Sequence, residues 1–234
     1  MRLDVLKAMN AARRERRAGA VVTRLADGDQ RFVAAEALGA DPLAAEIEAA
    51  LRMGKSGAAT AAGEDFFLTV HAPSPRLTLI GAVHISQALA PMARIAGLDV
   101  TIIDPRTAFA TPERFPETPV LAQWPDEALS AHPLDRFTAI CLLTHDPKID
   151  DPALTGALKA DCFYVGALGS RKTHAKRLER MRALGFDEAA LARIHAPIGL
   201  DIGAVSPAEI AVSILGEIVA SLRKKPLRSE SAAA

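Results

Sequence analysis

Three polar side chains that can exchange protons or hydrogen bonds follow an apolar run near the middle of the chain. Thr144, His145 and Asp146 come directly after the strand-like run at residues 138–143. A hydroxyl, an imidazole and a carboxylate can each bond to a ligand, and imidazole titrates near neutral pH. We predict that Thr144 and His145 bind a ligand, whereas an aspartate before proline is equally typical of an Asx turn or a helix cap.

A carboxylate and a guanidinium follow a second apolar run, at residues 100–103. Asp104 can accept a hydrogen bond from a ribose or another hydroxyl-bearing ring, and Arg106 can bind a phosphate with two parallel hydrogen bonds. We predict both as ligand-binding residues. The alternative is an ion pair between the two side chains, which would need no ligand.

A basic segment with two glycines is the third candidate, and its chemistry indicates an anion site. Gly166 and Gly169 allow the backbone to approach a ligand, and Ser170 can cap the helix that follows. Arg171, Lys172 and His174 place positive charge at the start of that helix, where the helix dipole disfavours cations unless an anion lies between them. We predict that this segment binds a phosphate; a capped surface helix is the alternative.

The turn after the apolar run 77–80 has the layout of a nucleotide-binding βαβ unit. Gly81 begins the turn, a helix follows, and Asp104 lies about twenty residues further on. Val83 stands where a second glycine is usual, and a β-branched side chain there disfavours a positive φ and fills space that a phosphate would use. His84 either lies beside a bound anion or caps the helix. The turn therefore predicts the fold and argues against ordinary dinucleotide binding.

These candidate residues follow strands in a regular alternation of strands and helices. Apolar runs predict strands at 77–80, 100–103, 120–123, 138–143 and 163–165. Such alternation with short links predicts an α/β fold with a Rossmann-like, doubly wound parallel sheet, in which ligands bind beyond the carboxyl ends of the strands. Further on, Ser206 and Glu209 have the spacing of a helix capping box.

A small N-terminal α+β appendage, residues 1–74, is predicted to precede the sheet. Its predicted elements are a helix at 3–17, hairpin strands at 20–25 and 30–34, a helix at 42–53, a loop at 54–63 and a strand at 65–71. Pro73 and Pro75 mark the boundary near residue 74. The Rossmann-like domain is expected to span residues 75–225, and residues 226–234 are expected to be a disordered tail.

The composition disfavours several classes of protein. Lys+Arg and Asp+Glu both number 28, so no net charge attracts nucleic acid or an anionic membrane. No run is long and apolar enough for a membrane span, and the first residues lack the apolar core of a signal peptide, so a cytoplasmic location is expected. Two cysteines are too few for a disulfide framework, and Cys141 is expected in the core.

From about residue 65 to 222 the chain resembles the XdhC/CoxI family of accessory proteins for molybdenum hydroxylases such as xanthine dehydrogenase. The resemblance is carried by Phe66-Phe67, Gly81-Ala-Val-His84, Asp104-Pro-Arg106, Thr144-His-Asp146, Tyr164-Val-Gly-Ala-Leu-Gly-Ser-Arg171 and His195-Ala-Pro-Ile-Gly-Leu-Asp-Ile-Gly203. Val83 departs from the family pattern, which has glycine there. The N-terminal part also lacks the cysteine-bearing segment that many members carry.

The resemblance implies a cytoplasmic, typically dimeric protein that binds the molybdenum cofactor (molybdopterin), a pterin with one phosphate or a dinucleotide. Such a protein protects the cofactor while a cysteine desulfurase supplies its terminal sulfur, and delivers it to an apo-molybdenum hydroxylase. The resemblance implies a maturation factor rather than an enzyme, so we assign no catalytic residue and no metal site. The expected cofactor-binding residues are Gly81, Val83, His84, Asp104, Arg106, Thr144, His145, Gly166, Gly169, Ser170, Arg171 and His174.

Two other functions fit the same residues. An NAD(P)-dependent oxidoreductase could use His145 as its acid or base, although Val83 weakens close contact with a pyrophosphate. An interaction subunit with a vestigial Rossmann site would bind no ligand at all. Whether bound pterin or bound nicotinamide is found distinguishes the three.

Overall fold

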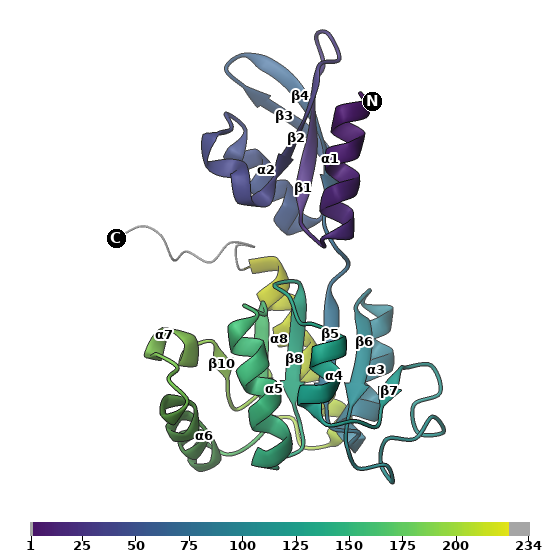
Figure 1. Ribbon diagram of the computed structural model, residues 1–234, viewed down its shortest axis with the longest axis vertical. Coiled ribbons are helices and arrows are strands. Elements are labelled where there is room, and N and C mark those ends of the chain that lie inside the picture. Colours follow the sequence, from purple (N-terminus) through teal and green to yellow (C-terminus); the bar gives the residue numbers. More distant parts are fainter. Residues whose placement is uncertain (1, 225–234) are drawn as a thin grey trace. The chain divides into compact units, whose positions relative to one another are not determined.

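The chain divides into two compact units. The computed structural model describes residues 2–224; the first unit takes in the residues up to Pro73, and the second comprises Ser74–Leu222. Figure 1 shows an antiparallel sheet with helices in the first unit and a parallel sheet between helices in the second. The tail predicted at residues 226–234 lies outside the described residues.

An antiparallel sheet of four strands, in the order β2-β1-β4-β3, forms the centre of the N-terminal unit. The predicted hairpin is confirmed, since β1 and β2 pair with Ala20 opposite Val33. Val5 of the first helix and Ile47 and Leu51 of the second are buried. The elements are α1 (Leu3–Arg14), β1 (Gly19–Arg24), β2 (Gln30–Ala34), η1 (Ala35–Ala40), α2 (Ala44–Met53), β3 (Gly57–Ala61) and β4 (Glu64–His71).

The strand β3 corrects the prediction of a loop at residues 54–63. Glycine and alanine dominate this stretch, and both have low strand propensity. In the folded unit, however, the backbone pairs antiparallel with β4, with Gly57 opposite Leu68 and Ala61 opposite Glu64. Pairing with a neighbouring strand satisfies the backbone donors and acceptors, so tertiary contact outweighs local propensity here.

Six parallel strands form the sheet of the second unit, in the order β10-β9-β8-β5-β6-β7. This order starts in the middle and proceeds outward in both directions, which is the Rossmann arrangement. The predicted fold class is therefore confirmed. The strands are β5 (Arg76–Ile80), β6 (Asp99–Ile103), β7 (Val120–Leu121), β8 (Thr138–Leu142), β9 (Tyr164–Ala167) and β10 (Ile194–His195). The sequence does not predict the short edge strand β10.

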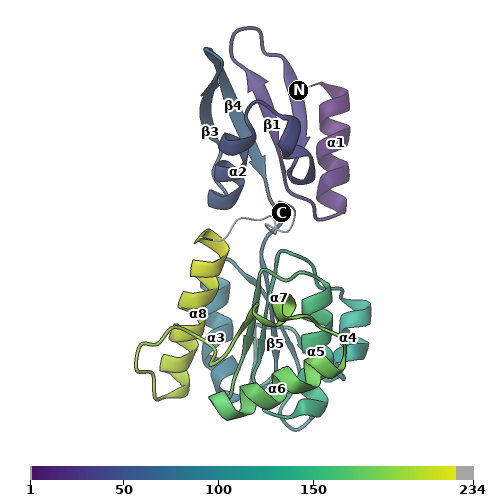
Figure 2. The same ribbon diagram turned by 90° about the vertical axis from the view of Figure 1, so that its left-hand side faces the viewer.

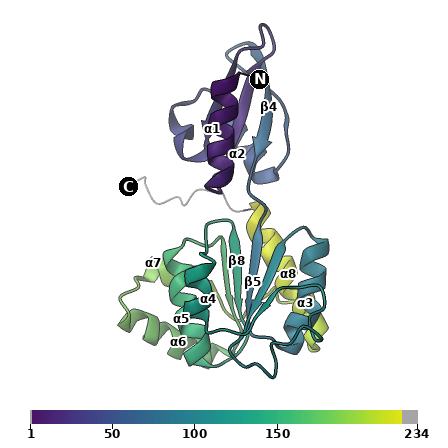
Figure 3. The same cartoon turned by 45° about the vertical axis from the view of Figure 1, so that its right-hand side comes forward.

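Helices cover both faces of the parallel sheet, as Figures 2 and 3 show from two sides. Alternate side chains of β5 point to opposite faces, so Leu77 and Leu79 pack with Ile214 in one core and Ile80 packs with Leu154 in the other. The first core contains α3 and α8, and the second contains α4, α5 and part of α6. The helices are α3 (His84–Ile95), α4 (Pro125–Ala131), α5 (Pro147–Lys159), α6 (Arg171–Ala183), α7 (Glu188–Leu191) and α8 (Pro207–Lys224).

A carboxylate on α8 fastens the glycine-rich segment 195–203 to the sheet. Glu217 Oε2 accepts hydrogen bonds from Tyr164 Oη at 2.6 Å and from the Gly199 N–H at 2.8 Å, and Oε1 lies 2.8 Å from His195 Nδ1. Burial acts to raise the pKa of Glu217, but these three hydrogen bonds lower it overall.

The capping box that starts α8 is also present, because Ser206 and Glu209 bond to each other's backbone N–H groups.

Candidate functional site

The predicted ligand-binding residues gather beyond the carboxyl edge of the parallel sheet. The central strands β5 and β8 are neighbours, with Ile80 opposite Leu142, and the helices that follow them, α3 and α5, pack on opposite faces. This is the topological switch point, where doubly wound sheets bind ligands. Gly81 and Thr144 meet there, since a Cβ added to Gly81 would lie 2.9 Å from Thr144 Cγ2.

The turn after β5 tolerates Val83 without strain, which corrects the part of the sequence-based argument that concerned a positive φ. Gly81 alone takes a left-handed φ, of 116°, whereas Val83 is extended with a φ of −102° and packs against the core. Ser86, in the third glycine position, is buried and donates a hydrogen bond from Oγ to the Gly81 carbonyl at 2.6 Å. His84 is exposed on the first turn of α3. The turn therefore keeps its shape without the second and third glycines.

Asp104 forms the ion pair that the sequence left as its alternative. The carboxylate is fully buried, and it accepts hydrogen bonds from the Ala82 N–H at 2.7 Å, the Arg106 N–H at 2.9 Å and the Arg106 guanidinium at 2.7 and 2.9 Å. Burial acts to raise the pKa of Asp104, but these bonds lower it overall. Both carboxylate oxygens are thus occupied within the chain. Asp104 is placed to hold the Gly81 turn and to orient Arg106, not to reach a ribose.

Arg114, which no sequence signal identifies, fastens the segment after β6 over the same turn. Its Nη1 donates to the carbonyls of Ala82 and Phe109, both at 2.8 Å, and its Nη2 donates to Gln87 Oε1 at 3.1 Å. The half-exposed Phe109 ring lies beneath two guanidiniums, with Arg106 Cζ at 4.7 Å and Arg114 Cζ at 5.7 Å. Two cations and an accessible aromatic ring therefore adjoin the start of α3.

The segment after β8 joins Thr144 to a buried acid. Thr144 Oγ1 donates to Asp150 Oδ1 at 2.7 Å and accepts from the Asp146 N–H at 3.1 Å. Asp146 caps α5, because its carboxylate accepts a hydrogen bond from the Lys148 N–H at 2.9 Å. The sequence offered helix capping as an alternative role for Asp146, and the structure shows that role. His145, between Thr144 and Asp146 in the chain, is exposed and has a φ of 63° that a non-glycine residue rarely adopts.

The two glycines of the basic segment have different roles. Gly166 is buried in β9, and a Cβ there would collide with Ile198, so its small size serves packing between strand and loop rather than approach to a ligand. Gly169 has a φ of 135° and leads into Ser170, whose Oγ accepts from the Thr173 N–H at 3.3 Å. Arg171 is exposed on the first turn of α6.

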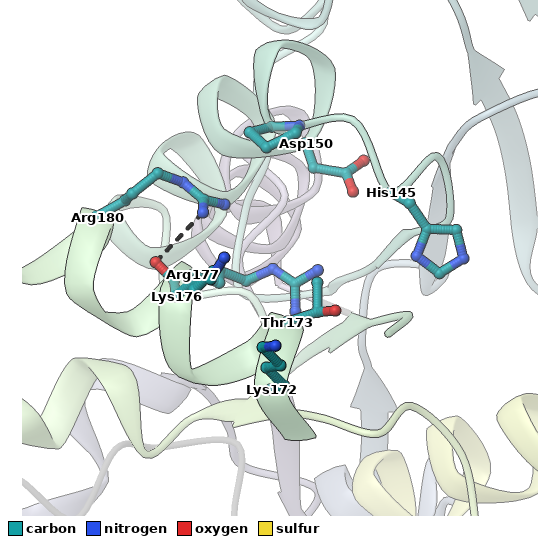
Figure 4. A pocket seen from close by; sticks show the side chains of 8 residues that line it. His145, Asp150, Lys172, Thr173, Lys176, Arg177 and Arg180 are labelled. Atoms are coloured by element: carbon teal, nitrogen blue, oxygen red, sulfur yellow. Dashed lines mark hydrogen bonds between the residues drawn. The ribbon is translucent and has the colours of Figure 1, made fainter. Parts of the chain in front are cut away.

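A pocket of about 290 Å³ lies between α5 and α6 beyond β8 and β9. Figure 4 shows the side chains of Asp150, His145, Lys172 and Arg177 around it. The lining residues are His145, Pro147, Asp150, Lys172, Thr173, Lys176, Arg177 and Arg180. His145 is the predicted site residue that lines this pocket; Arg171 and His174 belong to the same helix but are not among the lining residues.

Two charged side chains are buried at the base of this pocket without a full set of partners. Asp150 and Arg177 are each 2% exposed. Arg177 Nη2 donates to the Leu168 carbonyl at 2.9 Å, but among residues 2–224 neither Arg177 Nε, Arg177 Nη1 nor Asp150 Oδ2 has a hydrogen-bond partner. Burial raises the pKa of Asp150 and lowers the pKa of Arg177. Unpaired buried charge of this kind is typical of functional sites.

Of the lining residues, the sequence-based set contains only His145; the charged residues that it omits are Asp150, Lys172, Lys176, Arg177 and Arg180. A signal for two of them exists, because Lys172 belongs to the predicted basic cluster and Lys176, four residues further on, lies on the same face of a helix. Asp150 gives no such signal. It occupies the first turn of α5 beside the buried Ile149, and only the fold turns its carboxylate toward α6.

Replacing Asp150 with asparagine is expected to stabilise the ligand-free protein at neutral pH by on the order of 1 kcal/mol. A carboxyl whose pKa is raised in the folded state costs stability once the pH exceeds its ordinary value of 3.8, and the cost persists above the raised pKa. Urea unfolding of wild type and Asp150→Asn at pH 7.5 and near pH 4 measures the gain in stability, which should be larger at pH 7.5. Asp99→Asn, at an exposed position, is the control. A loss of stability at pH 7.5 would contradict the prediction.

Other chemistry has little support in the described part of the chain. Among residues 2–224, no group of three or more His, Cys, Asp or Glu side chains could hold a metal ion. Cys141 and Cys162 are free and buried, and burial raises the pKa of both thiols, that of Cys162 to about 12. No helix in the described range is long and apolar enough to cross a membrane.

The strand order, the switch point and the pocket beyond the carboxyl edge define a Rossmann-like α/β protein. The sequence model of the XdhC Rossmann domain matches residues 77–218, which is more than half of the chain. The chain therefore belongs to the XdhC family, as its motifs predict. The match includes the Gly81 turn, Asp104, the segment after β8 and the whole of α6.

Three curated relatives cover most of this chain. The uncharacterized protein YqeB of Escherichia coli is 36% identical over 72% of this chain, and 32% of YqeB is covered. The molybdenum cofactor insertion chaperone PaoD of E. coli is 34% identical over 64% of this chain and 41% of PaoD. A probable xanthine dehydrogenase subunit of Bacillus subtilis is 31% identical over 65% of this chain and 44% of that protein. The chain thus spans a third to under half of each relative's length.

A solved structure shows the same fold. The crystal structure of a xanthine dehydrogenase from Bacillus halodurans superposes with a TM-score of 0.65, covering 94% of this chain and 66% of that one. The two sequences are 18% identical, so this likeness concerns the fold alone.

Proposed function

We propose that this protein is an accessory protein that binds the molybdenum cofactor and assists its sulfuration and insertion into a molybdenum hydroxylase of the xanthine dehydrogenase type. The observation that carries the proposal is the match to the XdhC Rossmann domain over residues 77–218, which contain the switch point and the pocket. The names of PaoD and of the B. subtilis protein support it. The partners would be an apo-molybdenum hydroxylase and a cysteine desulfurase, and the protein would act as a cytoplasmic homodimer.

The geometry fits a binding protein that receives its sulfur from elsewhere. Both thiols are buried and have raised pKa values, so neither presents a thiolate to a bound cofactor. A separate cysteine desulfurase would then supply the terminal sulfur. His145, at the pocket, is a binding residue in this proposal.

The proposed binding surface comprises the turn at Gly81–His84, Arg106, Thr144 with His145, and the start of α6 from Gly169 to His174. Asp104 and Gly166 support this surface from within: Asp104 holds the turn and Arg106, and Gly166 lets Ile198 pack on β9. The cations on this surface suit a cofactor that carries phosphate.

Protein purified from cells that make the molybdenum cofactor is expected to release fluorescent pterin products after acid release and oxidation. Protein from cofactor-deficient cells is the matched control and should release none. The loaded protein should also activate an apo-hydroxylase, whereas the control preparation should not. Light scattering measures the molar mass in solution, which should be that of a dimer.

Two outcomes would contradict the proposal. Saturable NAD(P) binding without pterin in any preparation would indicate the oxidoreductase alternative. Binding of neither ligand, together with association with a hydroxylase, would indicate an interaction subunit with an unused Rossmann site.

A further inference from the structure

The pocket between α5 and α6 carries an excess of positive charge. Arg180 lines it but is paired with both carboxylate oxygens of Asp151. Lys172 and Lys176 are exposed at its rim, and no ion pair within residues 2–224 neutralises either of them or Arg177. Three cations therefore face a single acid, Asp150, and a ligand with about two negative charges would balance them.

The buried groups at the base define the ligand further. Arg177 and Asp150 both line the pocket, and Figure 4 shows both side chains directed toward its interior, yet no ion pair joins them. Arg177 Nε and Nη1 have no hydrogen-bond partner within residues 2–224, and the free N–H groups of a guanidinium can each donate a charge-assisted hydrogen bond to an oxyanion. Asp150 Oδ2 needs a proton between itself and the ligand, because two bare oxyanions would repel each other.

The volume and the position narrow the class of ligand. A cavity of about 290 Å³ is at the lower end for small-molecule sites, so it fits one group of a larger molecule. The pocket opens beside Thr173 on the first turn of α6, whose helix dipole also favours an anion.

We infer that this pocket binds a phosphate monoester or free phosphate, with Arg177 as the buried anchor, Lys172 and Lys176 at the rim, and Asp150 sharing one proton with the bound anion. The inference goes beyond the proposed function, because it follows from the pocket alone. The sequence predicts a phosphate at Gly166–Arg171, whereas Arg177 lies about a turn and a half beyond Arg171 along α6.

Titration of the full-length protein with inorganic phosphate, at constant ionic strength in potassium chloride, tests the inference by calorimetry and by phosphorus NMR. Wild type is expected to bind one phosphate saturably. Arg177→Met, similar in volume but without donors, should weaken binding about ten- to a hundredfold. Lys172→Gln and Lys176→Gln, which lie at exposed positions, should each weaken it several-fold, and a thermal melt checks that each variant folds.

Lys148→Gln is the matched control, since Lys148 is an exposed lysine on the first turn of α5 that does not line the pocket. It should bind phosphate like wild type. Asp150→Asn should bind at least as tightly as wild type, because an amide donates to the anion without needing the shared proton.

Four results would overturn the inference, three of them from the phosphate titrations. Those three are no saturable phosphate binding by wild type, an equal loss in Lys148→Gln and Lys172→Gln, and a larger loss in Arg171→Gln than in Lys172→Gln. Binding of a neutral, phosphate-free pterin that competes with phosphate would also overturn it, by showing that Asp150 accepts ring N–H groups. Because inorganic phosphate is the probe, failure of this test is distinct from failure to bind the molybdenum cofactor.

Discussion

A methyl group added at Gly81 is expected to lower the melting temperature of the parallel-sheet unit by about 6–12 °C, from roughly 3 kcal/mol of strain and overpacking. Two causes add. Gly81 has a φ of 116°, which an L-residue rarely adopts, and the new Cβ would lie 2.9 Å from Thr144 Cγ2. Thr144 has little freedom to turn away, because its hydroxyl is bonded to Asp150. Differential scanning calorimetry of Gly81→Ala measures the effect.

A double-mutant cycle separates these two causes. Thr144→Ser removes the colliding methyl and keeps the hydroxyl, so the pair Gly81→Ala and Thr144→Ser should lose less stability than the sum of the single variants. Gly185→Ala is the control, since Gly185 has a φ of 89° but nothing within 4 Å of an added Cβ, and it isolates the backbone cost. Strict additivity in the cycle would contradict the predicted contact between the Gly81 turn and Thr144.

Truncation of Glu217 to alanine is expected to destabilise the same unit by about 3 kcal/mol, measured by urea unfolding at pH 7.5. The carboxylate accepts hydrogen bonds from Tyr164 and Gly199 and contacts His195, so its loss leaves buried polar groups unpaired. Glu179→Ala, at an exposed position on α6, is the control and should change stability little.

The pH dependence of stability gives Glu217 a signature of its own. Its folded-state pKa is lowered, so its contribution is present above the ordinary value of 4.5 and is lost as the pH falls toward the lowered pKa. Glu217→Gln keeps a side chain of the same size and removes this titration. The difference in stability between wild type and Glu217→Gln should therefore shrink below pH 4.5; a constant difference from pH 7 to pH 3 would contradict the assignment.

The alternation of apolar runs with helical segments was sufficient to predict the Rossmann-like sheet. Buried parallel strands such as β5 and β8 need continuous apolar runs, because helices cover both faces. The elements missed are those with weak local preferences: β3 is made of glycine, alanine and one threonine, and β10 has only two residues. Both form because a neighbouring strand offers unpaired backbone groups.

The sequence predicts which residues lie near the candidate site, because that depends on their order along the chain, but it does not predict their contacts. A polar residue that follows a strand must lie at the carboxyl edge, which placed Thr144, His145 and Arg106 correctly along that edge. Chain order cannot show whether the carboxylate of an acidic residue already has hydrogen-bond partners within the protein. Both oxygens of Asp104 accept hydrogen bonds from Ala82 and Arg106, and these bonds form only when the turn folds. Asp150, in contrast, keeps one oxygen without a hydrogen-bond partner among residues 2–224, and no ion pair joins it to Arg177 of α6.

The sequence by itself determined the α/β class, the alternation that builds a doubly wound sheet, the glycine at position 81 and the family to which the chain belongs. These depend on periodicity, turn chemistry and motifs, which are local. Only the tertiary structure decided that Val83 is unstrained, that Gly166 serves packing, and that Asp150 and Arg177 share a pocket. Those depend on burial and on the distances between helices, which arise when separate segments pack together and which no single segment encodes.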